Sequence, residues 1–239
     1  MVLLFVIGVY MLISYMAFSN ARRSEQNKVW TGMAKETAHQ IGTPLSALLG
    51  WVAYLRTKYP EEGALDDMEL DLNRLTEITD RFSKIGSQPK LDQRDLSKTL
   101  QSSLAYLQPR IPKRIALNSQ VEPGVQVLHN APLLSWVVEN LVRNAVDAIE
   151  EHGSIEVQLR RLENGATIIV QDTGKGIPVN IQRRIFKPGY TSKSRGWGLG
   201  LSLAKRIVEE YHMGTLSLVE SHLGQGSTFE IKLQAIPQA

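Results

Sequence analysis

The chain has 239 residues, 43% of them hydrophobic, and a formal net charge of +3. This composition is typical of a folded protein with one large domain or two small ones, and it argues against intrinsic disorder. The small positive excess is not gathered into a block of Lys and Arg, so we expect no nucleic-acid partner. The absence of cysteine excludes disulfides, thiolate catalysis and cysteine-based zinc sites.

The first eighteen residues carry no charged side chain. A run of this length is about what a helix needs to cross a bilayer. Arg22 and Arg23 follow at once, and the positive-inside tendency then places the later residues in the cytoplasm. A signal peptide is the alternative, supported by cleavage-like residues 19–21, but no positive residue precedes the apolar run. We therefore expect residues 1–20 to form a single transmembrane helix, with the rest of the chain in the cytoplasm.

Residues 21–88 predict a helical hairpin. Up to residue 58, apolar residues recur in steps of four and three, as in a coiled-coil seam, at Ile41, Leu45, Leu48, Val52 and Leu55. A turn at residues 59–63 separates them from a second apolar stripe that runs from Leu65 to Ile85. One hairpin cannot bury both stripes well, so we expect a homodimer with a four-helix bundle. A monomer whose hairpin packs on its own second domain is the alternative.

After a break at residues 87–89 the pattern becomes mixed, and residues 89–239 predict a second domain. Helices are predicted over residues 95–107, 132–150 and 201–211, and strands over 114–121, 125–128, 154–161, 166–171, 215–219 and 227–233. Because strands are grouped with helices and do not alternate strictly with them, we expect an α+β sandwich with its helices on one face.

His39 lies in the first predicted helix, five residues before Pro44. It is two residues from the seam residue Ile41, roughly 200° around a helix, so its side chain should face solvent. A proline inside a helix removes one hydrogen bond and clashes with the carbonyl four residues back, which is that of Gln40. An exposed neutral imidazole can attack phosphorus, although a lone surface histidine is usually inert.

Asn140 and Asn144 are four residues apart in the helix predicted over 132–150, and therefore lie on one face of it. Amide oxygens are hard ligands that suit Mg²⁺, which takes its other ligands from phosphates and water. A polar surface face is the alternative, but it does not explain why amides stand here among apolar neighbours.

Asp172 ends an apolar strand and begins the segment Asp172-Thr-Gly174-Lys-Gly176-Ile177. A carboxylate there can accept a hydrogen bond from the exocyclic amino group of adenine, and the glycines permit close backbone approach. Thr228, in the last predicted strand, can support that carboxylate. An ordinary strand-to-loop turn is the alternative for the segment alone.

A second glycine-rich region precedes the helix predicted over 201–211. Its glycines predict a mobile lid that runs into a helix N-terminus, where backbone N–H groups and the helix dipole favour phosphate oxygens. Lys193 can add a point charge at the outer phosphates. The spacing is not that of a P-loop or of a dinucleotide fold. The residues of interest are Phe186, Thr191, Lys193, Gly196, Gly198, Leu199, Gly200 and Leu201.

Taken together, these motifs resemble bacterial sensor histidine kinases, in order and in rough spacing, over about residues 30–233. The resemblance implies a dimerisation and phosphotransfer hairpin followed by an ATP-binding domain of the kind shared with gyrase and a heat-shock chaperone. It implies that ATP and Mg²⁺ are the cofactors, that Asn144 is the metal ligand and that Asn140 assists at the phosphates. It further implies that Asp172 reads adenine. His39 would accept the γ-phosphoryl group and pass it to an aspartate in the receiver domain of a response regulator.

Two residues depart from the family pattern, and a third matches it. Gln40 replaces the acidic residue that often follows the phosphoacceptor, so transfer should be slower but not abolished, because neutral imidazole already has a lone pair. Asp147 stands where a basic residue is common, so one phosphate contact is lost or comes from Arg143 or Lys193. Thr43 matches the polar position used to place water for dephosphorylation, so we expect phosphatase activity towards the regulator as well.

Two other functions fit part of the pattern. An ATP-binding conformational regulator of the same fold would not phosphorylate histidine, and Gln40 keeps this alternative open. A chaperone-like or gyrase-like ATPase would transfer the phosphate to water, but it needs neither His39 nor a dimerisation hairpin.

Overall fold

The computed structural model describes residues 40–60, 62–83, 89–192 and 198–234, together with scattered residues between 5 and 18. The chain divides into two compact units, Met1–Gln88 and Pro89–Ala239. Within the described residues, no helix combines the length and the apolar character needed to cross a membrane. The transmembrane helix predicted at residues 1–20 falls mostly outside the described part of the chain.

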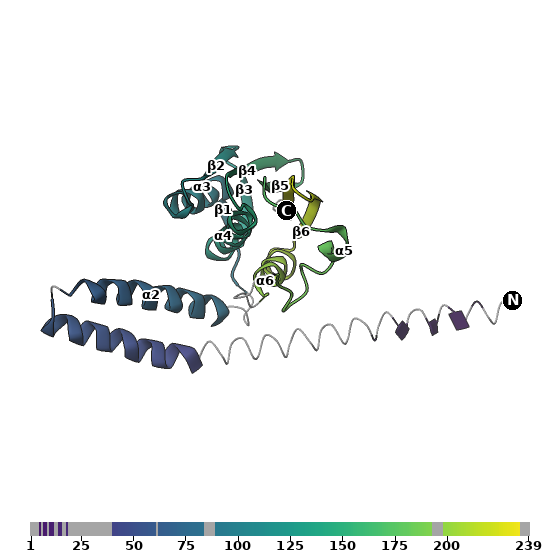
Figure 1. Ribbon diagram of the computed structural model, residues 1–239. Coiled ribbons are helices and arrows are strands. Elements are labelled where there is room, and N and C mark those ends of the chain that lie inside the picture. Colours follow the sequence, from purple (N-terminus) through teal and green to yellow (C-terminus); the bar gives the residue numbers. More distant parts are fainter. Residues whose placement is uncertain are drawn as a thin grey trace. The chain divides into compact units, whose positions relative to one another are not determined.

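The first unit contains a helix over residues 40–58 and helix α2 (Gly63–Ser83), which lie side by side (Figure 1). Leu45, Val52 and Leu72 form the core between them. The helix continues through Pro44, although proline has no N–H for the carbonyl four residues back. Apolar side chains at seam spacing therefore fold the hairpin despite the proline.

The seam residues divide into two groups. Leu45 and Val52 are 4% and 3% exposed, whereas Ile41 and Leu48 are 47% and 49% exposed. On α2, Leu65 and Leu72 are buried, while Met68 and Leu75 are about half exposed. One hairpin thus buries only part of each apolar stripe, as the sequence predicts, and the four-helix bundle stays a prediction.

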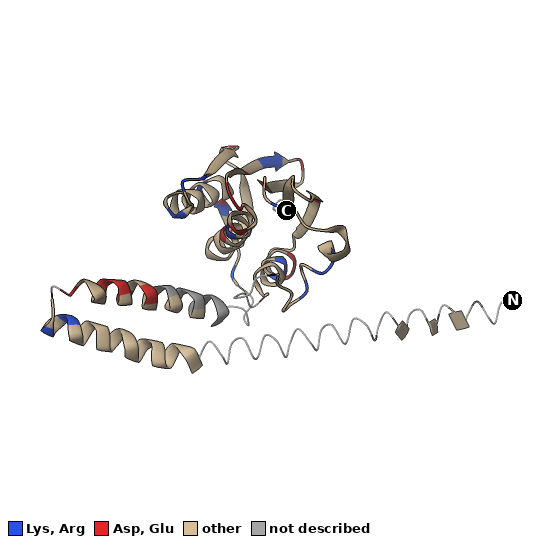
Figure 2. Ribbon diagram, in the orientation of Figure 1, with Lys and Arg blue, Asp and Glu red and all other residues tan. Residues whose placement is uncertain are grey.

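The tip of the hairpin joins unlike charges. Figure 2 shows acidic residues on the first half of α2 and basic residues at the end of the helix over 40–58. Nη2 of Arg56 lies 2.7 Å from a carboxylate oxygen of both Asp66 and Glu69. These groups are well exposed, so each pair contributes at most about 1 kcal/mol. The pairs favour the register that the apolar core requires.

The second unit is built on a mixed sheet of five strands in the order β2-β4-β5-β7-β6. β2 runs parallel to β4, and the other neighbours are antiparallel. A separate antiparallel pair joins β1 (Asp92–Asp95) to β3 (Gln126–His129). The strands of the large sheet are β2 (Ile115–Val121), β4 (Gly153–Leu162), β5 (Gly165–Asp172), β6 (Thr215–His222) and β7 (Gly226–Gln234).

Helices pack on this sheet and enclose its core (Figure 1). They are α3 (Leu96–Leu107), α4 (Ala131–Ala148), α6 (Gly200–Arg206) and a π-helical turn, η3 (Ile207–Tyr211). α4 contacts β4, β5 and β7, while α6 contacts β6. Alternate residues such as Ile168, Val170 and Ile231 are buried beneath them. The predicted mixed α/β domain is confirmed.

Four elements of this unit were not predicted. β1 is polar along its whole length, the short α5 (Val179–Gln182) lies within the glycine-rich stretch, and the helix predicted over 201–211 changes to a π turn at Ile207. A 3-10 turn, η2 (Gln108–Arg110), also extends α3.

Edge strand β6 carries a bulge. Leu218 pairs with Phe229 and Glu220 pairs with Thr228, so the register shifts at Val219, which is exposed. A bulge of this kind leaves one residue without a cross-strand partner and increases the local twist.

Candidate nucleotide site

Two asparagines lie on one face of α4. Nδ2 of Asn144 donates to Oδ1 of Asn140 over 3.1 Å. Nδ2 of Asn140 is buried and has no hydrogen-bond partner among the described residues. A buried amide donor without an acceptor costs about 1–3 kcal/mol, so this atom favours a ligand that brings an oxygen. The predicted pair is therefore brought together, with one donor left for an acceptor such as a phosphate oxygen.

The start of α6 lies against this pair. A β-carbon on Gly200 would lie 2.7 Å from Oδ1 of Asn140, so only glycine fits there without movement. Gly198 has a φ of 66° and approaches the backbone of Gly189, whose N–H donates to the Gly198 carbonyl over 3.0 Å. The predicted glycines thus bring the first turn of α6 close to the asparagine face.

Asp172 ends β5 as a buried carboxylate. Its Oδ1 accepts from the N–H of Gly174 over 2.8 Å. Burial raises the pKa of the Asp172 carboxyl, while backbone N–H groups of Gly174 and Ser227 act in the opposite direction. Two N–H donors on a buried carboxylate hold it in place for a further donor, which adenine can supply through its amino group.

The pairing of β7 with β5 decides which residue of β7 lies beside Asp172. Ser227 pairs with Asp172, whereas Thr228 pairs with Gln171. Successive side chains of a strand point to opposite faces of the sheet. Ser227, and not Thr228, therefore shares the face of Asp172, which corrects the expectation that Thr228 supports the carboxylate.

The loop after Asp172 is held by close backbone contacts. A β-carbon on Gly174 would lie 2.7 Å from the carbonyl of Ala148, and one on Gly176, whose φ is 71°, would lie 2.0 Å from that of His222. The N–H of Ile177 donates to Oγ of Ser221 over 2.7 Å. At both predicted positions only glycine fits the space that the neighbouring carbonyls leave.

Ser221 is the residue of this region that the sequence did not indicate. Its hydroxyl also contacts the carbonyl of Gly226 and Oγ of Ser227, at 3.1 and 2.9 Å. It joins the loop after β5 to the start of β7. A serine in a strand carries no distinctive sequence signal, so only the fold reveals this role.

Phe186 packs between Phe229 of β7 and Lys205 of α6. Its ring meets that of Phe229 edge-to-face, with centroids 6.4 Å apart, and Nζ of Lys205 lies 4.8 Å from its centroid. Nζ of Lys205 also donates to the carbonyl of Leu216 over 3.2 Å. Leu199 and Leu201 are half-buried and Thr191 is exposed. The contacts of the Phe186 ring are therefore those of a packing residue, with one cation above the ring.

Several predicted residues lie elsewhere. His39, Lys193 and Gly196 fall outside the described residues, so their roles stay predictions. Gln40 and Thr43 belong to the first unit, where both are exposed on the helix over 40–58.

The donor set fits Mg²⁺ bound together with phosphates. Within the described residues, no group of three or more His, Asp or Glu side chains is placed to hold a metal alone. Because Nδ2 of Asn144 faces Asn140, its Oδ1 lies on the other side of the carboxamide. The site therefore offers one hard oxygen, Oδ1 of Asn144, beside Nδ2 of Asn140. This set suits Mg²⁺, which takes most of its ligands from phosphates and water.

Comparison with known proteins gives consistent matches. Residues 129–237 match the family described as "Histidine kinase-, DNA gyrase B-, and HSP90-like ATPase". The chain is 31% identical to sporulation kinase D of Bacillus subtilis (strain 168) over 244 residues, covering 97% of this chain and 47% of that protein. The chain thus spans about half the length of this curated relative.

Solved structures match as well. The catalytic domain of histidine kinase ThkA aligns with a TM-score of 0.56 and 25% identity, covering 61% of this chain and 96% of that one. A complex of ThkA with response regulator protein TrrA aligns with a TM-score of 0.59 and 22% identity, covering 93% of this chain and 67% of that one. The second match supports the fold alone.

Proposed function

Because the chain belongs to the bacterial sensor histidine kinases, with an ATP-binding domain of the histidine kinase, gyrase B and HSP90 type, we propose that it phosphorylates His39 from ATP. The observation that carries the proposal is the unpartnered Nδ2 of Asn140, held beside Asn144 and against the first residue of α6. Asp172, at the end of β5, would bind the other end of the nucleotide through adenine.

In the proposed reaction the protein acts mainly by positioning the nucleotide and the attacking imidazole. Nδ2 of Asn140 would donate to a phosphate oxygen, and Asn144 would hold Mg²⁺, which supplies charge neutralisation at the phosphates when bound. The ring nitrogen of neutral His39 attacks the γ-phosphorus while the bond to the bridging oxygen breaks, and ADP leaves. Gln40 cannot accept a proton, but its amide can orient the imidazole.

The phosphoryl group would then pass to an aspartate of a response regulator. A response regulator is the partner class that the resemblance to bacterial sensor histidine kinases implies, and it is carried over by analogy. Thr43 is exposed and lies four residues after His39 in the sequence, and a hydroxyl there can place a water molecule. We therefore include phosphatase activity towards the regulator in the proposal.

The assembly and location belong to the same proposal. The half-exposed Ile41, Leu48, Met68 and Leu75 support a homodimer in which two hairpins share one bundle. The uncharged run over residues 1–18, followed by Arg22 and Arg23, supports a single inner-membrane span with the catalytic unit in the cytoplasm.

The test is incubation of the full chain with γ-labelled ATP and Mg²⁺, with His39→Ala alongside. We expect label that survives base, is lost in acid and is absent from the variant. ATP binding without label would favour the conformational regulator. Gln40→Glu, which restores the acidic residue common in the family, would then be the first variant to test. Label that persists in His39→Ala would show that another residue is the acceptor.

A further inference from the structure

The two helices that carry the site touch at two separate points. One is the contact of Asn140 with Gly200, at the start of α6. The other joins Asn130, which caps α4, to His212, which follows η3, over 3.0 Å. Asn130 and Asn140 are about 15 Å apart along α4 at 1.5 Å per residue. The helices therefore run antiparallel and are fixed at both ends of their contact.

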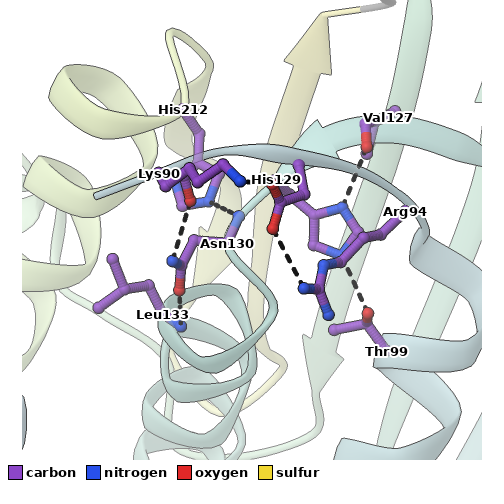
Figure 3. Close-up of polar contacts among 9 residues, drawn as sticks. Lys90, Arg94, Thr99, Val127, His129, Asn130, Leu133 and His212 are labelled. Carbon is purple, nitrogen blue, oxygen red and sulfur yellow. Dashed lines mark hydrogen bonds and ion pairs between the residues drawn. The ribbon is translucent and has the colours of Figure 1, made fainter. Parts of the chain in front are cut away.

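Asn130 forms hydrogen bonds through both its backbone and its side chain, and Figure 3 shows those to Lys90, Leu133 and His212. Its backbone N–H donates to Nε2 of His212, and its carbonyl accepts from Leu134 over 3.0 Å. Its Oδ1 caps α4 by accepting from the N–H of Leu133 over 3.2 Å, and its Nδ2 donates to the carbonyl of Lys90 over 3.1 Å. The residue thus joins the start of α4, the end of η3 and the first residues of the second unit.

His212 is held as firmly as its partner. Its backbone N–H and its Nδ1–H both donate to the carbonyl of Ile207, over 3.1 and 2.8 Å. Because Nε2 accepts from an N–H group, the ring must be neutral with its proton on Nδ1. The wide π turn of η3 points this buried ring at Asn130. π turns within helices are often found at functional sites.

A second buried imidazole stands beside this contact. Nδ1 of His129 donates to the carbonyl of Val127 over 3.1 Å, and Nε2 accepts from Oγ1 of Thr99 over 2.9 Å. Figure 3 shows His129 and His212 on either side of the Asn130 backbone. Both ring nitrogens of each histidine are hydrogen-bonded, so each ring is held in one orientation beside Asn130.

We propose that Asn130 and His212 are positioning residues for nucleotide binding, forming a clamp that sets the gap between Asn140 and Gly200. Neither residue belongs to the nucleotide-binding set described above. Gly200 and Asn140 are packed closely, because Gly200 has no room even for a β-carbon. A broken clamp would let α6 shift along α4, and Gly200 would then move relative to the asparagine face that receives the phosphates. The inference rests on the proposed nucleotide binding.

The test compares His212→Phe with His212→Gln in the full chain. Affinity for a non-hydrolysable Mg²⁺–ATP analogue is measured by calorimetry, well below the thermal midpoint of either variant. We expect His212→Phe to weaken binding about tenfold, the equivalent of one lost hydrogen bond. His212→Gln should stay within about threefold, because its Oε1 can accept from the Asn130 N–H in place of Nε2.

A matched control separates positioning from general loss of stability. Asp95 caps α3 by accepting from the N–H groups of Ser97 and Lys98, and α3 carries no nucleotide residue. Asp95→Ala should lower the midpoint of unfolding and leave analogue affinity within about twofold. If His212→Phe does not fold, His212→Ala serves instead, because it also removes the acceptor for the Asn130 N–H, and it should weaken binding by about threefold or more.

Wild-type affinity in a folded His212→Phe or His212→Ala variant would overturn the clamp. The clamp would also be overturned if Asp95→Ala, compared at the same stability, lost as much affinity for the analogue as His212→Phe. If the wild type binds the analogue but does not label His39, the kinase proposal fails and the clamp is still decided by the affinities. A wild type that does not bind the analogue would overturn both.

Discussion

Oδ1 of Asn140 lies 2.7 Å from the point where a β-carbon on Gly200 would stand. Gly200→Ala should therefore push the carboxamide away from α6. Because that group is a movable side chain and alanine favours a helix by about 1 kcal/mol, we expect little change in stability. Nucleotide affinity, measured by calorimetry, should fall about tenfold or more through the displaced donor.

Gly50→Ala is the matched control for this change. Gly50 is also helical, and no heavy atom lies within 4 Å of its added β-carbon. This variant should gain about 0.5–1 kcal/mol of stability and keep its affinity for nucleotide. Unchanged affinity in Gly200→Ala would contradict the assignment of Asn140 to the phosphates.

Asp172→Asn should separate nucleotide binding from stability. Burial raises the pKa of Asp172 above the ordinary 3.8, so ionisation opposes folding as the pH rises through the raised pKa. At pH 7 the variant should be as stable as the wild type, or more so, in urea unfolding. Its affinity for ATP should fall about thirtyfold, since a charged acceptor for the adenine amino group is lost. Glu163→Gln, an exposed acid in the β4–β5 turn, should leave both quantities unchanged.

The buried histidines should make folding sensitive to acid. Burial lowers the pKa of both His129 and His212 below 6.5, so below that pH the unfolded chain binds more protons than the native one. Their contribution to stability is complete above about pH 6.5, and it falls by up to about 1.4 kcal/mol per pH unit and histidine as the pH decreases. Urea unfolding at pH 7.5 and 5.5 measures this slope. His212→Gln should reduce the slope, and a slope unaffected by that change would contradict the neutral ring.

Leu48→Lys should weaken the proposed dimer. Leu48 is half exposed in a single hairpin, so in a four-helix bundle its side chain would be buried against the second copy. A lysine there would place a charge in an apolar interface, and sedimentation equilibrium should show a shift towards monomer. Thr57→Lys, about 180° around the same helix, should leave the association unchanged. Equal behaviour of the two variants would contradict the bundle.

Periodic apolar residues predict most of the second unit. The predicted helices at α3 and α4 and the strands at β2 to β7 appear within a few residues of their expected bounds. β1 was missed because Asp92–Asp95 contains no apolar residue, and it is a strand only because β3 pairs with it. Its pairing is a tertiary effect that local preference does not contain.

The site shows a similar division. Asn140, Asn144 and Asp172 were predicted because residue type and spacing already indicate a face or a strand end. The choice between Ser227 and Thr228 depends on strand register, where a shift of one residue moves a side chain to the other face of the sheet. Ser221 and His212 act through contacts with residues far along the chain, and sequence spacing does not predict such contacts.

The bulge at Val219 bears on solubility. β6 is an outer strand of the sheet, and a regular outer strand offers unpaired N–H and C=O groups to a strand from another molecule. The register shift between Leu218 and Glu220 interrupts that template. Deletion of Val219 would make the edge regular, and we expect the protein to aggregate through its second unit. The extra residue in β6 thus opposes strand pairing between the sheet edges of different molecules.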